Sequence, residues 1–314
     1  MNEFALIQKY FNQLGAEHSQ PATIYAIGDD AAIIQPPLGQ QLVITSDTLV
    51  AGRHFPHDTP PHAIGWKAAA VNLSDIAAMG ATPYAVLMAI SLPQVDSDWL
   101  AQFSRGFFDC CAPENVQLIG GDTTKSEVLS ITVTALGWVE AGTAIRRDGA
   151  QIDDLIVVSN TLGDAAYALQ QPQSALQSRL DYPQPQNKLG MALAGFAHSM
   201  LDISDGLAQD LSHILTASQV GAVLYLDQLP LSPPLQQLPA EQAWQLALTG
   251  GDDYELCFTI APSQFEQFKN SLSVAQQQQF NLHIIGKITS GDGLQLFQQG
   301  APYTMNLKGY QHFD

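Results

Sequence analysis

Five short segments of the chain place aspartate beside glycine, serine or threonine, each at the end of an apolar run. Two carboxylates about 4 Å apart repel by roughly 4 kcal/mol at an effective dielectric near 20, so gathering these side chains requires cations. Oxygen ligands without a His or Cys cluster favour a hard cation, Mg²⁺ more readily than Zn²⁺. The segments therefore predict a site that holds phosphate through several metal ions. They are residues 28–30, 45–48, 72–75, 120–124 and 202–206.

Glycines and arginines near these aspartates suit the same chemistry. Gly120 and Gly121 permit close approach of the backbone to a phosphate, and Asp122 with its following threonines can hold metal. Arg146 and Arg147 are adjacent in a chain with only 12 Lys and Arg residues. Such a pair is usually solvated, but guanidinium groups also suit phosphate contacts, so both interpretations stay open.

An alanine-rich helix must position two of the polar groups. Residues 66–80 favour helix, and Gly80 followed by Pro83 predicts its end. Asn72 and Asp75 are three residues apart and therefore share one helix face. A carboxylate on an apolar helix is costly to bury unless a cation or several donors meet it. Considered alone, Asp75 would equally suit an exposed position near the helix end.

Apolar runs predict the elements around this helix. Strands are expected at residues 41–46, running into Asp47, and at 116–119, ending at the glycine pair. Further strands are expected at 84–92, 129–139, 155–159, 222–226 and 256–260, and helices at 3–14, 99–111 and 188–200. The pattern breaks at 141–154, where we place the boundary between a first domain, 1–145, and a second, 146–314. The expected fold class is α/β (α+β) with two domains.

Composition limits the partners. The net charge of −18 disfavours nucleic acid and anionic membranes. No run reaches the ~18 apolar residues of a membrane helix, and the N-terminus lacks the features of a signal peptide. The three cysteines, an odd number, indicate reduced thiols in a cytoplasmic protein. A phosphorylated substrate is compatible with so acidic a chain if metal ions lie between the two anions.

Several familiar catalytic motifs are absent from the sequence. It has no Walker loop, GxGxxG, HExxH or GxSxG element, which disfavours P-loop kinases, dinucleotide-dependent dehydrogenases and α/β-hydrolases. His54 follows the strand at 41–46 in a polar loop and lacks metal-ligand spacing to His57 or His62. A surface position explains it at least as well as a functional one.

The motifs, in this order, resemble the thiamine-monophosphate kinase family, in the superfamily that includes aminoimidazole ribonucleotide synthetase and selenophosphate synthetase. The first half carries Ile-Gly-Asp-Asp-Ala at 27–31, Thr-Ser-Asp-Thr-Leu-Val at 45–50, His-Phe at 54–55, the helix segment at 70–80 and Gly-Gly-Asp-Thr at 120–123. The second half carries Asp-Ile-Ser-Asp-Gly-Leu at 202–207, Gly-Gly-Asp-Asp-Tyr-Glu-Leu at 250–256 and Lys-Gly-Tyr at 308–310. The resemblance extends from about residue 3 to residue 313.

The resemblance implies ATP-dependent phosphorylation of thiamine phosphate to thiamine diphosphate, assisted by several Mg²⁺ ions. By position, the implied Mg²⁺ ligands are Asp30, Thr45, Ser46, Asp47, Asp75, Asp122, Asp202 and Asp205. The implied nucleotide contacts are Gly121, Asp122, Arg147 and Ser204, and the implied substrate contacts are His54, Asp252 and Tyr310. We expect metal ions held by the catalytic residues Asp47, Asp75 and Asp122 to bridge the phosphates of the two substrates. Because the substrate phosphate is already ionised, no general base is expected.

The resemblance also implies that the sheet of an N-terminal α/β domain pairs with that of a second subunit into a barrel, followed by a C-terminal α/β domain. The strands expected at 41–46, 84–92 and 129–139 are independently too apolar for one exposed sheet face. Both considerations predict a homodimer formed through residues 1–140.

Two points of detail stay open. The family usually has Glu where this chain has Asp252, so Asp253 or Glu255 could take that contact instead. Asp29 and Asp30 compete in the same way for one ligand position. Tyr310 is expected to cover the cationic thiazolium ring of the substrate.

Two other functions stay open at this point. A related synthetase, making aminoimidazole ribonucleotide or selenophosphate, would share most of the motifs, although no candidate catalytic Cys near the N-terminus supports the latter. A non-catalytic metal- or nucleotide-binding module would also explain Asp-rich loops, but the chain has no DxDxDG calcium loop. The His54 segment and Tyr310 favour the kinase.

Overall fold

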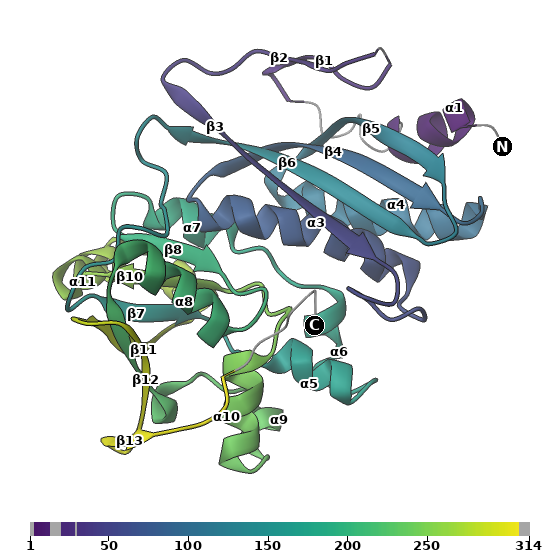
Figure 1. Cartoon of the computed structure of the whole chain (residues 1–314). Coiled ribbons are helices and arrows are strands. Elements are labelled where there is room, and N and C mark those ends of the chain that lie inside the picture. The colour runs from purple at the N-terminus through teal and green to yellow at the C-terminus, as the bar shows by residue number, and fades with distance from the viewer. Residues whose placement is uncertain (1–2, 13–19, 29, 308–314) are drawn as a thin grey trace. The chain divides into compact units, whose positions relative to one another are not determined.

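The computed structural model describes residues 3–12, 20–28 and 30–307 of the chain (Figure 1). Asp29, Tyr310 and the last two residues of the helix expected at 3–14 lie outside the described residues. The chain divides into two compact units. The first unit is Met1–Ile76, Ala81–Gly142 and Asp181–Asn187, and the second is Ala77–Gly80, Thr143–Leu180 and Lys188–Asp314.

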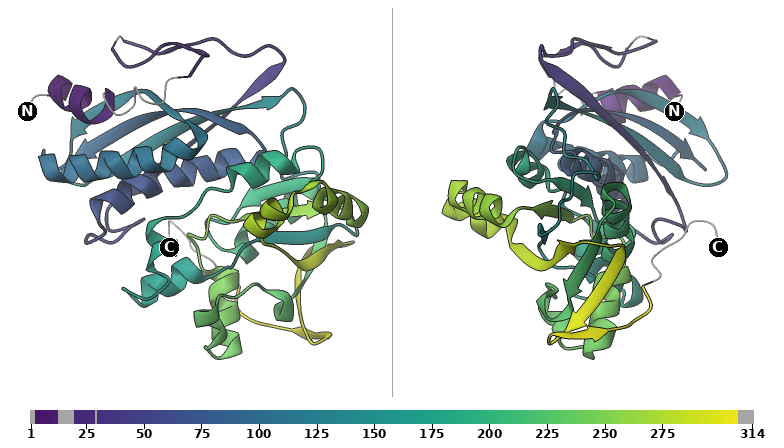
Figure 2. Two further views of the ribbon diagram at one scale, coloured as in Figure 1. Left: turned by 180° about the vertical axis from the view of Figure 1, so that it is seen from behind. Right: turned by 60° about the vertical axis from the view of Figure 1, so that its left-hand side comes forward.

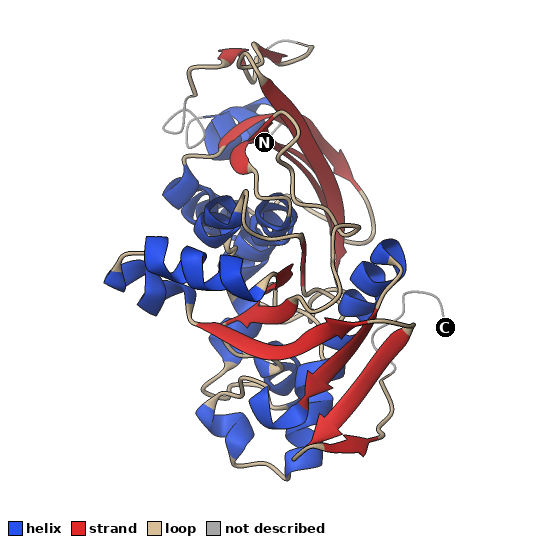
Figure 3. Cartoon of the chain, turned by 90° about the vertical axis from the view of Figure 1, so that its left-hand side faces the viewer, coloured by secondary structure: helices blue, strands red, loops and turns tan. Residues whose placement is uncertain are grey.

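A four-stranded sheet forms the centre of the first unit. The strand order is β3-β6-β4-β5, and only the β4–β5 pair is parallel. Helices α3 and α4 lie on one face of the sheet (Figure 3). The bounds are α1 Glu3–Leu6, η1 Ile7–Asn12, β1 Thr23–Tyr25, β2 Ile33–Ile34, β3 Gln40–Val50, α3 Pro61–Ala78, β4 Thr82–Leu92, α4 Ser97–Cys111, η3 Ala112–Glu114, β5 Gln117–Lys125 and β6 Ser130–Glu140.

Two strands are longer than the sequence predicted. Strand β3 continues through Asp47 to Val50, and β5 continues through Gly121 and Asp122 to Lys125. The prediction that these aspartates follow strand ends is therefore wrong. Thr and Ser can be part of a strand. Strand β3 pairs with β6 along its whole length, so it continues even though its residues become polar after Ile44.

The N-terminal helix also differs from its prediction. The expected helix at 3–14 begins as α1 but continues as the π-helix η1, whose Tyr10 and Phe11 are buried. Tyr10 and Phe11 thus pack in the core, whereas the type of helix differs from the expected one.

A seven-stranded sheet forms the centre of the second unit, with strand order β13-β12-β9-β11-β7-β10-β8. The strands are β7 Leu155–Ser159, β8 Ser199–Asp202, β9 Gly221–Tyr225, β10 Leu256–Ile260, β11 Leu282–Thr289, β12 Gly293–Gln298 and β13 Ala301–Tyr303. The helices are α5 Asp164–Gln170, α6 Gln177–Asp181, α7 Asn187–Leu193, α8 Leu207–Ser218, η4 Leu226–Gln228, α9 Pro233–Gln236, α10 Ala240–Thr249, α11 Pro262–Ser271 and α12 Val274–Phe280.

Apolar clusters cover both faces of this sheet. Alternate residues of β7, namely Ile156 and Val158, pack with α8 and α10, whereas Val157 packs with α7, α11 and α12. This alternation is the expected pattern of a strand buried on both sides. Figure 2 shows the same elements from two further directions.

Two segments that carry sequence motifs, 202–207 and 250–256, lie beside the end of β7 at one end of the strands of the seven-stranded sheet. Strand β10 is antiparallel to both β7 and β8, so the ends of β7 and β8 lie beside the start of β10. Ligands of open α/β sheets commonly bind outside the carboxyl ends of strands. The helix expected at 188–200 is wrong in its second half, because α7 ends at Leu193 and β8 begins at Ser199.

The observed architecture confirms the predicted two-domain mixed α/β class. No described helix has the length and apolar character needed to cross a membrane.

Candidate functional site

A contact between β3 and α3 joins two of the sequence-derived metal ligands. The Thr45 hydroxyl on β3 donates a hydrogen bond of 2.6 Å to Oδ2 of Asp75 on α3. Asp75 is half-buried, while most of its neighbours on the helix are buried. A partly buried carboxylate needs such donors, so Thr45 fixes how Asp75 is presented.

Asn72 connects the same helix face to the next candidate ligand. Its Oδ1 accepts a hydrogen bond of 3.0 Å from the backbone N–H of Asp47, and its Nδ2 donates to the carbonyl of Ala68 at 3.1 Å. Strand β3 is an edge strand, so some of its N–H groups face away from β6, and Asn72 supplies the acceptor for the Asp47 N–H. Asn72 and Asp75 therefore share one helix face, as predicted, and that face meets β3.

Hydroxyl groups line the other side of β3. Ser46 pairs with Thr134 at 3.0 Å and Thr48 pairs with Thr132 at 2.9 Å, both across the β3–β6 ladder. Ser46, a candidate metal ligand, and Thr48 are exposed. This face of the sheet offers neutral oxygen ligands, whereas Thr45 projects toward the helices.

Gly121 and Asp122 lie on the opposite edge strand, β5. Gly121 has φ +147°, and a Cβ at this position would lie 1.8 Å from the carbonyl oxygen of Met88 on β4. Close packing between strands therefore requires this glycine, whether or not a phosphate approaches it. Asp122 is exposed and pairs with Ala89 on β4.

Asp47 and Asp122 are separated by the width of the sheet. Three strand spacings lie between β3 and β5, which amounts to about 14 Å in a flat sheet. Carboxylates so far apart cannot bind the same ion directly. Consistently, no group of three or more His, Cys, Asp or Glu among the described residues is arranged to hold a metal ion.

Two other candidates of the first unit lie in connecting segments. Asp30 is exposed between β1 and β2. His54 lies in the turn after β3, where its Nδ1 accepts from the backbone N–H of Val50 at 2.9 Å and its carbonyl accepts from Lys67 at 3.2 Å. An accepting Nδ1 places the proton of the neutral imidazole on Nε2.

In the second unit, a single carboxylate fixes the turn that carries Ser204 and Asp205. Oδ2 of Asp210 accepts from the backbone N–H groups of Ser204, Asp205 and Gly206 at 3.0, 3.0 and 3.1 Å. Burial raises the pKa of Asp210 to about 7, and the hydrogen bonds from these N–H groups oppose that rise. The turn follows Asp202 at the end of β8.

The segment that carries Asp252 packs against this turn. The N–H of Asp252 donates to the Ser204 carbonyl at 2.9 Å, and the N–H of Tyr254 donates to the Ile203 carbonyl at 2.8 Å. Asp252 has φ +69° and Tyr254 has φ +50°, a left-handed conformation that costs of order 1–3 kcal/mol for each non-glycine residue. The Tyr254 hydroxyl donates to Oδ1 of Asp252 at 3.1 Å.

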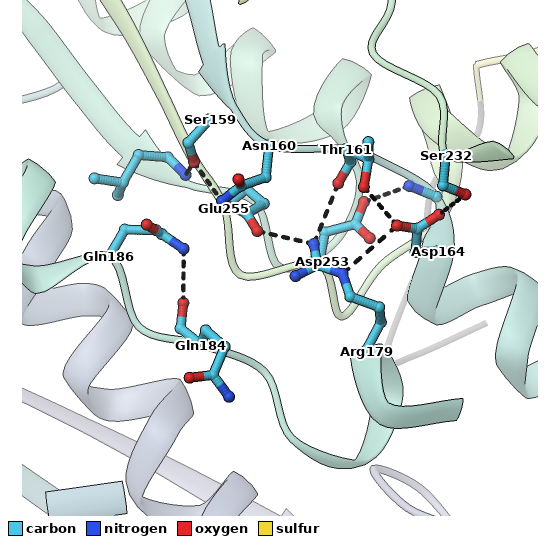
Figure 4. Close-up of polar contacts among 12 residues, drawn as sticks. Ser159, Asn160, Thr161, Asp164, Arg179, Gln184, Gln186, Ser232, Asp253 and Glu255 are labelled. Atoms are coloured by element: carbon cyan, nitrogen blue, oxygen red, sulfur yellow. Dashed lines mark hydrogen bonds and ion pairs between the residues drawn. The ribbon is translucent and has the colours of Figure 1, made fainter. Parts of the chain in front are cut away.

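Asp253 and Glu255 belong to a buried polar cluster centred on Arg179, which also includes Ser159, Asn160, Thr161, Asp164 and Ser232 (Figure 4). Arg179 bonds Oε1 of Glu255 at 2.8 Å. Oε2 of Glu255 accepts from Ser159 at 2.5 Å and from Asn160 at 3.0 Å. Asp253 is 2% and Glu255 0% exposed, so neither side chain is accessible to a substrate. Of the three acids that the motif offers, Asp252 is therefore the candidate substrate contact. Its role stays a prediction.

The Arg179 cluster contains more acids than bases. Asp164 accepts from Thr161 and Ser232, each at 2.6 Å, and lies 3.5 Å from Nε of Arg179. Burial raises the pKa of Asp253 to about 8, although the Gly163 N–H and Arg179 oppose this rise. Burial also raises the pKa of Glu255, against the pull of Arg179. A pKa of about 8 means that Asp253 keeps its proton at neutral pH, next to Arg179 and Glu255, whose side chains lie 2.8 Å apart.

This protonation predicts a pH-dependent stability. Between about pH 4 and pH 8 the native state retains a proton on Asp253 that the unfolded chain has released. The free energy of unfolding then falls with rising pH, by up to about 1.4 kcal/mol per unit from this group. Asp253→Asn cannot titrate. Its stability relative to wild type should therefore rise from about pH 5 to pH 8 and level off above, as measured by urea unfolding.

The exposed Asp292 supplies the control for this measurement. The relative stability of Asp292→Asn should stay constant over the same pH range. A relative stability of Asp253→Asn that does not change with pH would show that Asp253 is ionised in the native protein.

The structure does not bring Arg147 to the turn that carries Ser204. The Arg147 carbonyl accepts from the hydroxyl of Ser218, the last residue of α8, at 2.9 Å. Ser204 precedes the first turn of that helix, which at 12 residues is about 18 Å long. The second unit alone therefore places these two candidate nucleotide contacts at opposite ends of α8.

Sequence reasoning missed Arg179 and the anchoring function of Asp210. Arg179 follows a Gln- and Pro-rich stretch that gives no structural signal, and its partner Glu255 is 76 residues away. The scarcity of arginine in the chain could have drawn attention to Arg179. An acid in the apolar first turn of a helix could have drawn attention to Asp210.

Family comparisons match both parts of the chain. The N-terminal domain of the AIR synthase related proteins matches residues 28–139, and the corresponding C-terminal domain matches residues 153–299. Among curated proteins, thiamine-monophosphate kinase of Haemophilus influenzae is 45% identical over an alignment that covers all of this chain and 98% of the relative.

Solved structures give the same result. The crystal structure of thiamine-monophosphate kinase from Stenotrophomonas maltophilia superposes with a TM-score of 0.86 at 43% identity, covering 96% of this chain and 98% of that one. A structure of AaThiL complexed with AMPPCP and TMP superposes with a TM-score of 0.76 at 30% identity, covering 99% and 97%. The similarity thus includes both halves of the fold.

Proposed function

The chain belongs to the thiamine-monophosphate kinase family, within the AIR synthase related proteins, and we propose its activity on this basis. It transfers the terminal phosphoryl group of ATP to the phosphate of thiamine phosphate, which gives thiamine diphosphate and ADP. The observation that carries this conclusion is 45% identity over the full chain to a thiamine-monophosphate kinase. The related structure with an ATP analogue and TMP supports the same pair of substrates. The synthetase and binding-module alternatives are not favoured.

The acceptor determines what the protein must do. A phosphate oxygen is already an anionic nucleophile near neutral pH, so the site has to align two phosphates and offset their repulsion. Groups that are held rigidly and can bind metal or phosphate suit this task better than a general base. Thr45 and Asn72 hold Asp75 and Asp47 in the first unit, and Asp210 holds the Ser204–Asp205 turn in the second.

The donor set fits Mg²⁺. The ligands would be Asp30, Thr45, Ser46, Asp47, Asp75, Asp122, Asp202 and Asp205, all of them oxygen donors. Mg²⁺ is usually bound by one or two carboxylates together with substrate phosphates and water. This fits a chain in whose described residues no three His, Cys, Asp or Glu side chains are arranged to hold a metal ion by themselves. Bound Mg²⁺ supplies neutralisation of phosphate charge.

The remaining candidates contact the two substrates. Gly121, Asp122, Arg147 and Ser204 are the proposed nucleotide contacts, and His54, Asp252 and Tyr310 the proposed thiamine phosphate contacts. The Nδ1 of His54 accepts from the Val50 N–H, so Nε2 carries the proton of the neutral ring and is the atom that we propose to contact a phosphate oxygen. We also place the protein in the cytoplasm, which the three free, buried cysteines support.

We further propose that the active form is a homodimer in which β3 of one subunit lies beside β5 of the other. Both strands are edges of the described sheet. Leu42 and Ile44 on β3 are 43% and 60% exposed, more than is usual for strand residues of this kind. Closure about a twofold axis would cover them and remove the open edges. It would also bring Asp47 toward Asp122 of the partner subunit, which one subunit cannot do.

Acceptor specificity tests this function. Thiamine phosphate should stimulate ADP release in the presence of Mg²⁺, whereas thiamine should be at least about a hundredfold poorer in kcat/KM. The thiamine hydroxyl lacks the charged oxygen and leaves the phosphate-binding groups unfilled. Equal stimulation by both acceptors would contradict the assignment.

A further inference from the structure

We propose that the buried Arg179 cluster is the positioning element of the segment that presents Asp252, and thereby sets the affinity for thiamine phosphate much more than the affinity for ATP. This inference rests on the proposed function. Arg179, Asp253 and Glu255 are positioning residues, because each acts through the backbone that carries Asp252.

The Asp252 segment needs an external anchor. Asp252 and Tyr254 are both left-handed, so the conformation on either side of Asp253 is intrinsically unfavourable. Asp253 is the residue between them, and its Oδ2 accepts from the Gly163 N–H at 2.8 Å. Its Oδ1 is buried and has no hydrogen-bond partner among the residues that the structure describes. A buried side chain in this position holds the segment to the β7–α5 connection.

Arg179 joins the structures on which this anchor depends. Its guanidinium bonds Glu255 at the start of β10, approaches Asp164 at the start of α5, and donates to the Thr161 carbonyl at 3.3 Å. Asp253 therefore rests against a β7–α5 connection that Arg179 fixes to β10. Removing the guanidinium leaves buried Asp164 and Glu255 without their cation, and the connection that receives Asp253 loses its support.

The nucleotide side of the same end of the sheet has a separate anchor. Ser204 and Asp205 are held by Asp210, which none of the Arg179-cluster hydrogen bonds involves. The two segments meet closely, since a Cβ on Gly251 would lie 2.6 Å from the Ser204 carbonyl oxygen. The backbone bond from the Asp252 N–H to the Ser204 carbonyl couples the two segments. Because each segment has its own side-chain anchor, removing one anchor should still affect its own segment more than the other.

Steady-state kinetics with each substrate varied in turn tests this separation. Arg179→Met and Asp253→Ala should raise KM for thiamine phosphate by about tenfold or more and KM for ATP by less than about threefold, since displacement by ~1 Å costs up to about a hundredfold. Asp210→Ala should show the opposite pattern. Arg179→Lys, which keeps the cation, should recover part of the loss, and Asp253→Asn, which keeps the bond to Gly163, should recover most of it.

One further variant keeps the test decisive if Arg179→Met fails to fold, and another serves as a control. Tyr254→Phe keeps the ring and removes the hydroxyl that donates to Asp252, so KM for thiamine phosphate alone should rise several-fold. Asp154→Asn alters a buried carboxylate that bonds His198 at 2.9 Å, outside the Arg179 cluster, and should change neither KM.

Equal increases in both KM values, or no increase in folded Asp253→Ala and Tyr254→Phe, would overturn the inference. Failure of the proposed function would look different, because the wild-type protein itself would then form no thiamine diphosphate.

Discussion

Asp75→Asn is expected to lower kcat/KM by about a thousandfold or more without unfolding the protein. The Asn side chain still offers an oxygen to the Thr45 hydroxyl, so the β3–α3 contact is retained. What disappears is the negative charge that the proposed Mg²⁺ site requires. Asp47→Asn should have an equally large effect for the same reason, and its backbone bond to Asn72 is unaffected.

Three comparisons separate loss of charge from loss of structure. Circular dichroism should show unchanged folding, and the exposed Asp98→Asn on α4 should retain wild-type turnover. Thr45→Val removes the orienting hydroxyl but leaves the carboxylate, so a smaller loss, about tenfold, is expected. Near wild-type turnover of folded Asp75→Asn or Asp47→Asn at millimolar Mg²⁺ would contradict the proposed metal ligands.

Mixing two inactive variants is expected to restore about one quarter of wild-type activity. If Asp47 acts with the partner's Asp122, an Asp47→Asn subunit paired with an Asp122→Asn subunit has one intact site and one doubly altered site. Random exchange makes half of the dimers mixed, and each mixed dimer has half of its sites active. Each variant alone should be nearly inactive.

The control for this experiment is the pair of Asp47→Asn with Asp75→Asn. Both residues meet at β3 and α3 of one subunit, so the mixture should not recover activity. Light scattering at micromolar concentration should show a dimer throughout. A stable monomer, or no recovery with Asp122→Asn after subunit exchange, would contradict the shared site.

The central helix shows how far local sequence reaches. Alanine content, a glycine stop and the spacing of Asn72 and Asp75 predicted α3 and its polar face, because helix periodicity is a local property. The ends predicted for β3 and β5 were wrong, because polar residues end a strand only where no neighbouring strand pairs with them. Strand β6 pairs with β3 along its full length, and that pairing is not visible locally.

The Arg179 cluster lies beyond local sequence reasoning for a related reason. Its members come from β7, the β7–α5 connection, α5, α6, the residue before α9 and the segment before β10, and their separations in sequence have no period. The Gly-Gly-Asp-Asp-Tyr-Glu-Leu motif indicated three possible acids, but only burial separates Asp253 and Glu255 from Asp252. Likewise, the distance between Asp47 and Asp122 depends on the order of the strands in the sheet, which cannot be read from the sequence.

Phosphorus NMR of the products tests the central claim most directly. The protein is supplied with Mg²⁺, ATP and thiamine phosphate, and every phosphorus species is followed to completion. Direct transfer predicts ADP and thiamine diphosphate in equal amounts, with little inorganic phosphate. ATP consumption that yields ADP and inorganic phosphate without thiamine diphosphate would contradict the account, even if every aspartate named here proved to bind metal.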